Sequence, residues 1–295
     1  MKQTNVNSAL PLRLFLTAIF FFILLLFAGS GLSAAIISLL GFSPYSTLDL
    51  PERQWFRLAL LGNNLLTFSV SALLSFWWVY RKRWASAAGF TLKANDKSVP
   101  FGVSVFLLSL PLVAWLAWIN LQAPLPDWAV RSEEQTNQFL HSILTMESVP
   151  ELFLALLTAA VTPAIGEELL LRGLLQRRVL APLLGNHHLA IWLAAFAFSF
   201  MHFEFAGFLP RLLLGATLGY AYHWSRSIWV PIVLHFLFNG MQVMVAYFSG
   251  GFTPDTEMEI VPPWWLALAS LVAILYIGWK AEQLYGRAEA RQETA

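Results

Sequence analysis

The chain has 295 residues, of which 58% are hydrophobic and only 12% are charged. Soluble domains contain about 25% charged residues, so this composition excludes an ordinary water-soluble globular protein and a disordered chain. The net charge of +1 gives no basic excess for nucleic-acid binding, and the absence of cysteine excludes disulfides and thiolate chemistry. A polytopic membrane protein is the class that remains.

Apolar runs divide most of the chain into candidate membrane helices. A helix needs about 20 mostly apolar residues to cross a hydrocarbon core about 30 Å thick. The fifth and sixth runs are separated by a very short gap and are the least distinct. We expect an all-α polytopic membrane protein with about eight transmembrane helices, at 13–40, 55–80, 101–121, 149–180, 188–205, 207–224, 228–249 and 263–281.

The distribution of Lys and Arg predicts the orientation of these helices, because basic residues concentrate in cytoplasmic loops. The basic loops hold Arg81, Lys82, Arg83, Lys93, Lys97, Arg177, Arg178, Arg226, Lys280, Arg287 and Arg291. The acidic loops hold Asp127, Glu133, Glu134, Glu147, Asp255, Glu257 and Glu259. We expect both termini to be cytoplasmic in a bacterial plasma (inner) membrane.

One acidic loop contains a predicted helix outside the membrane. Between 132 and 147, apolar residues recur at intervals of three and four, which is typical of an amphipathic helix. We expect this helix to lie at the extracytoplasmic interface, and contact with a substrate is the alternative.

The fourth run contains two adjacent carboxylates, Glu167 and Glu168, followed by Arg172. Ionisable side chains inside a membrane are costly and are usually functional. Neighbouring helical residues point about 100° apart, whereas Glu168 and Arg172 share one face and can pair. Glu167 is then free for chemistry. The structural alternative is that both acids join an ion network with Arg172, Arg177 or Arg178.

Two more polar clusters lie at a similar expected depth. His202 follows Phe198 by four residues in the fifth run, and His235 and Asn239 share one face of the seventh. Counted from the same membrane face at about 1.5 Å per residue, Glu167 and His202 lie about 20 Å in, and His235 and Asn239 about 10–17 Å. Each residue alone would fit hydrogen bonding between membrane helices. Together they predict one polar cavity inside the membrane.

These four side chains are suited to activating water and stabilising an oxyanion. We expect Glu167 to act as the general base, with His202 orienting the water or sharing its proton. His235 and Asn239 would donate hydrogen bonds to the oxyanion of a tetrahedral intermediate. Ser199 lies near His202 in the sequence, but nothing else marks it as a nucleophile, so a serine hydrolase is not favoured.

Metal-assisted hydrolysis is the other chemical alternative, because Glu and His are zinc-ligand types. The sequence has no His-Glu-x-x-His helix. His187 and His188 follow Gly185 and Asn186, a pattern typical of a loop and helix cap. We expect no cofactor, and metal dependence is not favoured.

In this order, the three clusters resemble the signature of the CAAX-protease and bacteriocin-processing (CPBP, or ABI) family. That signature reads Glu-Glu-x-x-x-Arg, Phe-x-x-x-His and His-x-x-x-Asn, and the resemblance covers about residues 150–245. It implies an intramembrane glutamic endopeptidase, similar to the type 2 CAAX prenyl proteases, with a cavity reached from the cytoplasm.

The resemblance also implies a role for each matching residue. Glu167 corresponds to the water-activating base and His202 to its partner. His235 and Asn239 correspond to the oxyanion-binding pair. The supporting positions, which maintain the geometry or shape of the site, are Glu168, Arg172 and Phe198.

We expect three regions and a peptide or protein substrate. Residues 1–148 would form N-terminal helices and the interfacial helix, 149–249 the motif-bearing core, and 250–295 a last helix and a cytoplasmic tail. The substrate would be membrane-associated, with or without a lipid group. The helices would contact membrane lipids, and we expect no nucleic acid as a partner.

A non-catalytic scaffold or a bacteriocin-immunity-type protein is the alternative function. A proton-coupled transporter is also open, although the internal symmetry usual in transporters is missing.

Overall fold

The computed structural model describes residues 9–43, 48–90, 93–251 and 261–286, and within these ranges it contains helices and no strands. The predicted all-α fold is therefore confirmed. The segments long and apolar enough to cross a membrane are Ala9–Leu40, Leu50–Ala88, Val99–Leu121, Val149–Leu184, Trp229–Ser249 and Trp264–Tyr285.

Two of the eight predicted spans are not among these six. The run at 188–205 forms only α10 (His187–Phe200), whose 14 residues extend about 21 Å. The run at 207–224 forms α11 (Phe208–Ser225), a full-length helix with polar residues along it. The described residues thus contain six apolar helical spans long enough to cross a membrane, and the count of eight stays a prediction.

Most of the remaining helices follow the apolar runs, and the others lie between these runs. In chain order they are α1 Ala9–Leu40, α2 Leu50–Asn64, η1 Leu65–Val70, α3 Ser71–Tyr80, η2 Arg81–Arg83, α4 Trp84–Ala88, α5 Val99–Leu121, α6 Asp127–Leu144, α7 Val149–Leu156, η3 Leu157–Val161, α8 Thr162–Glu168, η4 Leu169–Leu180, α9 Ala181–Leu184, α12 Trp229–Ser249 and α13 Trp264–Tyr285.

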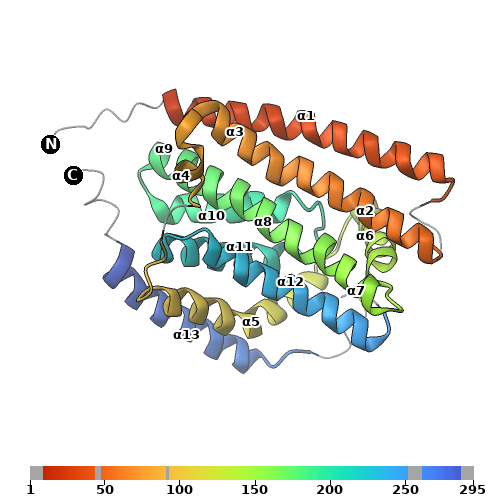
Figure 1. The fold of residues 1–295 in the computed structure, drawn as a ribbon. Helices are drawn as coiled ribbons and strands as arrows, with labels where there is room; N and C mark the ends of the chain where they lie inside the picture. Colours follow the sequence, from red (N-terminus) through yellow and green to blue (C-terminus); the bar gives the residue numbers. More distant parts are fainter. Residues whose placement is uncertain (1–8, 44–47, 91–92, 252–260, 287–295) are drawn as a thin grey trace.

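The helices pack as a bundle with one long central rod (Figure 1). Helix α1 lies along α2 and α3 on one side, and α5 and α13 pack together on the other. The rod from α7 to α9 runs between these sides, in contact with α10 and α12. The start of α1 and the end of α13 lie at the same end of the bundle, opposite α6 and α7.

Local sequence signals explain where several helices begin and end. Asp49 and Glu52 form a capping box that starts α2, in which each side chain accepts a hydrogen bond from the backbone of the other. Gly250 ends α12 in the left-handed conformation, with φ of +82°. These caps satisfy backbone groups that a membrane could not hydrate.

Large apolar side chains cover the outside of the bundle. Phe27 and Leu39 of α1 are 74% and 87% exposed, and Phe248 of α12 is 77% exposed. A water-soluble monomer rarely exposes so much contiguous apolar surface. Lipid chains would cover it, and the chain is accordingly an integral membrane protein.

Two expected loops differ in detail. The helix predicted at 132–147 is α6, which begins earlier because the extended backbone of Pro126 precedes its first residue, Asp127. Arg81–Arg83, expected in a loop, form the short helix η2 that continues into α4. Asp255, Glu257, Glu259, Arg287 and Arg291 lie outside the described residues.

Candidate functional site

The four predicted chemical residues meet in one place. Glu167, His202, His235 and Asn239 all line a cavity of about 250 Å³. Glu167 comes from α8, His202 from the turn after α10, and the other two from α12. Glu167 and Asn239, which are more than 70 residues apart in the sequence, therefore share one cavity. Their similar predicted depths in the membrane agree with this.

Glu168 lies behind this cavity in a fully buried ion pair. Its Oε1 atom is 3.0 Å from Arg172 Nη1, which is the i, i+4 pair expected from sequence. Arg172 also donates from Nη2 to the Gly215 carbonyl at 3.0 Å, and its guanidinium lies 4.9 Å from the Phe198 ring centroid. A buried carboxylate is tolerable only with such partners.

Glu168 also fixes the orientation of His235. The Nδ1 atom of His235 lies 2.9 Å from Glu168 Oε1, and a carboxylate in the ion pair with Arg172 is an acceptor, so Nδ1–H donates. In a neutral imidazole this leaves Nε2 as an acceptor. Asn239 Nδ2 lies 3.2 Å from that Nε2 and donates to the Ala159 carbonyl at 3.2 Å. Both N–H bonds of the Asn239 amide thus have partners within the protein.

Glu167 is the carboxylate available to the cavity. Its side chain is 11% exposed, and its Oε2 atom lies 4.0 Å from His235 Nε2. This buried oxygen has no hydrogen-bond partner among the described residues. Glu168 is paired with Arg172 as expected from the sequence, whereas the chemical role of Glu167 stays a prediction.

His202 is not within a helix as predicted. Helix α10 ends at Phe200, and Phe203 has a positive φ of 53°, which turns the chain away from the helix axis. His202 Nδ1 lies 2.8 Å from the Phe198 carbonyl, which can only accept, so Nδ1 carries the proton. The other ring nitrogen of neutral His202 is then an acceptor.

Phe198 packs between the two imidazoles of the site. Its ring lies edge-on to His202 at 5.0 Å and to His235 at 5.7 Å. Ser199, next to it, is buried and donates its hydroxyl to the Phe208 carbonyl at 2.7 Å. It does not line the cavity, which gives no support to a serine nucleophile.

Several polar residues near the site or in the core were not predicted from the sequence. Glu204 and Arg211 form an ion pair that lines the same cavity. At the α6 end, Glu151 pairs with Arg57 at 3.0 Å and with Arg53 at 3.2 Å. The i, i+4 spacing of Arg53 and Arg57 in an apolar helix was the available signal.

Comparisons with known proteins find similarity in the part of the chain that carries the motifs. Residues 149–241 match the family model described as type II CAAX prenyl endopeptidase Rce1-like. The chain is also similar to the uncharacterized protein YpbD of Bacillus subtilis (strain 168), with 29% identity over 104 residues. That similarity covers 34% of this chain and 47% of YpbD, so the chain spans about half of this relative's length. No solved structure matches the chain significantly.

The family match contains all three motifs, from Glu167 to Asn239. It therefore includes the helices that carry these motifs and the ion pair behind the cavity, whereas the lining residues Phe106, Leu140 and Leu144 lie outside it. Residues 149–241 of this chain are thus similar to the Rce1-like type II CAAX prenyl endopeptidases.

Proposed function

We propose that this protein is an intramembrane endopeptidase in which Glu167 activates the water that hydrolyses a peptide bond. The observation that carries the proposal is the cavity shared by Glu167, His202, His235 and Asn239. The adjacent Glu168 is already held by Arg172 and His235, so Glu167 is the carboxylate left for chemistry.

In the proposed reaction, Glu167 takes a proton from a water molecule as its oxygen attacks the peptide carbonyl carbon. The free ring nitrogen of His202 accepts a hydrogen bond from the same water and aligns it. The tetrahedral intermediate then collapses as the carbon–nitrogen bond breaks. The proton held by Glu167 passes to the leaving amine.

His235 and Asn239 would stabilise the oxyanion after an exchange of hydrogen bonds. In the resting arrangement the Asn239 amide donates to His235 and to the Ala159 carbonyl. The oxyanion would replace one of these acceptors, or a protonated His235 would donate from Nε2. Catalytic hydrogen bonds often tighten only when a substrate is bound.

The apolar lining of the cavity and the similarity to the Rce1-like family support a proposal for the substrate class. Phe106, Leu140, Leu144, Leu214 and Phe238 line it together with the polar groups. Such walls suit the aliphatic side chains of a CAAX-type C-terminus, with or without a prenyl group. No metal or other cofactor enters this proposal.

The test uses purified protein with farnesylated and unlipidated CAAX peptides, each with and without a chelator. Glu167→Gln keeps the shape of the side chain and removes its basicity, so kcat should fall about 10²- to 10⁴-fold. Glu134→Gln on the exposed side of α6 is the matched control and should leave kcat unchanged. Full activity of Glu167→Gln would show that Glu167 is not the base.

A non-catalytic membrane scaffold is the second candidate. The observation in its favour is that His235 Nδ1 and the Asn239 amide already have protein partners, as in polar residues that link membrane helices. In that case the wild-type protein would cut neither peptide. Glu167→Gln and His202→Ala would lower thermal stability in detergent without loss of the biological function.

A further inference from the structure

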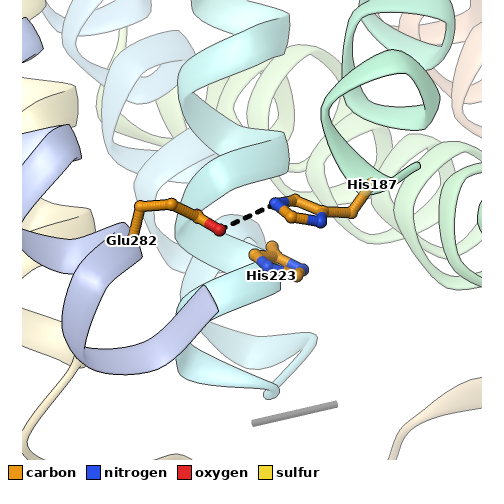
Figure 2. A group of neighbouring side chains, drawn as sticks. All are labelled: His187, His223 and Glu282. Carbon is orange, nitrogen blue, oxygen red and sulfur yellow. Dashed lines mark ion pairs between the residues drawn. The ribbon is translucent and has the colours of Figure 1, made fainter. Parts of the chain in front are cut away.

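A second cluster of titratable side chains lies outside the cavity already described. His187 is the first residue of α10, His223 lies near the end of α11, and Glu282 near the end of α13. Figure 2 shows the three side chains directed toward one another from these three helices. One ligand atom from each lies within 4.8 Å of the others. None of the three lines the cavity of Glu167.

The two imidazoles of the cluster lie face to face. His187 and His223 stack nearly parallel, with centroids 4.2 Å apart and planes 6° apart. Two imidazolium cations at this spacing would repel each other. Neutral imidazole is the form that coordinates metal ions.

The carboxylate is held toward the imidazoles by a further contact. Glu282 Oε1 lies 2.9 Å from His187 Nε2, and Oε2 accepts a hydrogen bond from Trp224 Nε1 at 3.1 Å. A ligand carboxylate that also accepts such a bond is typical of metal sites, where outer partners orient the ligands. His188 lies beside the cluster, with Nε2 4.0 Å from Glu282 Oε1.

A small second cavity adjoins the cluster. It has a volume of about 20 Å³ and is lined in part by His187 and His223. A cavity needs about 10–15 Å³ to hold one water molecule. There is therefore room next to the two imidazoles for one exogenous ligand of a bound ion.

We propose that His187, His223 and Glu282 bind a divalent transition-metal ion, for which Zn²⁺ is the probe. Two imidazoles, one carboxylate and one water form a common ligand set for zinc, whereas Mg²⁺ and Ca²⁺ prefer oxygen ligands. The side chains would shift by about an ångström or less to reach zinc–ligand distances of about 2.0–2.2 Å.

The ion would join three helices at one end of the bundle. Helix α13 packs mainly on α5, and α10 and α11 pack on each other. Coordination would tie α13 to this α10–α11 pair, whose connecting turn carries His202. The proposed role is structural, and it does not depend on the proposed peptidase reaction.

The first test measures Zn²⁺ binding by calorimetry to the purified full-length protein in detergent. The wild type should bind one equivalent. His223→Ala should raise Kd at least about 100-fold, since loss of an outer partner alone costs about 10- to 100-fold. His141→Gln removes a histidine of α6 and is the control with unchanged Kd. His235→Gln should also leave Kd unchanged, which separates this site from the cavity of Glu167.

The second test keeps the proposal falsifiable if one variant folds poorly. Glu282→Gln keeps the hydrogen-bond acceptor for Trp224 and loses the charge. Zinc should raise the thermal unfolding midpoint of the wild type but not of Glu282→Gln or His223→Ala. The proposal is wrong if the wild type binds no zinc at micromolar concentration. It is equally wrong if His223→Ala and Glu282→Gln bind as tightly as the wild type.

Discussion

Glu168 organises the site without lining its cavity. It is fully buried, and one of its oxygens lies near both Arg172 Nη1 and His235 Nδ1. By accepting a hydrogen bond from Nδ1–H, it determines which nitrogen of His235 faces Glu167. A carboxylate that orients an imidazole in this way sets its tautomer and direction.

Glu168→Gln tests this positioning role. The amide keeps the size of the side chain but leaves Arg172 without its buried counter-charge. We expect kcat to fall about 10²- to 10⁴-fold. The lower value is typical of losing a hydrogen-bond partner that orients a ligand residue, and the higher value is typical of losing the carboxylate that orients the histidine of a catalytic triad. KM should change little, and Glu168→Asp should restore part of kcat. Peptide-cleavage kinetics measure both constants, and a Glu168→Gln variant with wild-type kcat would contradict the orienting role.

At the scale of residues, the sequence predicts contacts within a helix better than contacts between helices. The pairing of Glu168 with Arg172 follows from their i, i+4 spacing. The meeting of His187 with His223 and Glu282 has no such signal, because three separate helices supply them. In the sequence, the residues around His187 therefore indicated only a helix cap. In the structure Asn186 is that cap, because its side-chain oxygen accepts a hydrogen bond from Leu189 N at 3.1 Å.

At the scale of elements, the position of Glu167 depends on how closely α8 approaches η1. A Cβ atom on Gly166 would lie 2.7 Å from Phe68 Cβ and 2.8 Å from Ser69 Oγ. Small residues allow membrane helices to approach this closely. Gly166, directly before Glu167, thus allows the close spacing of α8 and η1. This spacing in turn positions Glu167.

Gly166→Ala should therefore destabilise the protein and disturb catalysis. The added methyl group must separate α8 from η1, at a cost of about 1–3 kcal/mol typical of overpacking. Gly31→Ala is the matched control, because no atom lies within 4 Å of its added Cβ in α1. That control should gain about 0.5–1 kcal/mol from helix propensity. Thermal unfolding in detergent and peptide cleavage compare the two. Equal stability of both variants would show that the close approach is unimportant.

Helix existence was predictable from apolar runs, whereas some helix ends were not. The end of α10 before His202 depends on the positive φ of Phe203, for which the sequence carries no glycine signal. The apolar run simply continues through Phe200 and Met201. The wide π-helical turns of η4, which begin directly after Glu168, are likewise invisible in the hydropathy pattern. Such turns are frequent at functional sites.

At the scale of the whole molecule, two expectations concern which end of the bundle faces the cytoplasm. Basic residues predict that the end carrying the start of α1 and the end of α13 is cytoplasmic. The family resemblance implies that the cavity is entered from the cytoplasm. Leu140 and Leu144 of α6 line the cavity, and α6 lies at the opposite end of the bundle from the start of α1 (Figure 1). Sequence alone could not reveal this arrangement, because it requires the position of α6 relative to the cavity.

The absence of cysteine allows single-cysteine labelling to decide the orientation without altering any native thiol. Ser86→Cys in α4 and Gln135→Cys in α6 are exposed positions at the two ends, and neither change alters the charge. Following the distribution of Lys and Arg, we expect a membrane-impermeant maleimide to label Gln135→Cys in intact cells and Ser86→Cys only after lysis. Leu140→Cys in the cavity wall should then label from the same side as Gln135→Cys. Labelling of Ser86→Cys in intact cells would instead place α6 on the cytoplasmic side, together with the cavity wall that it forms.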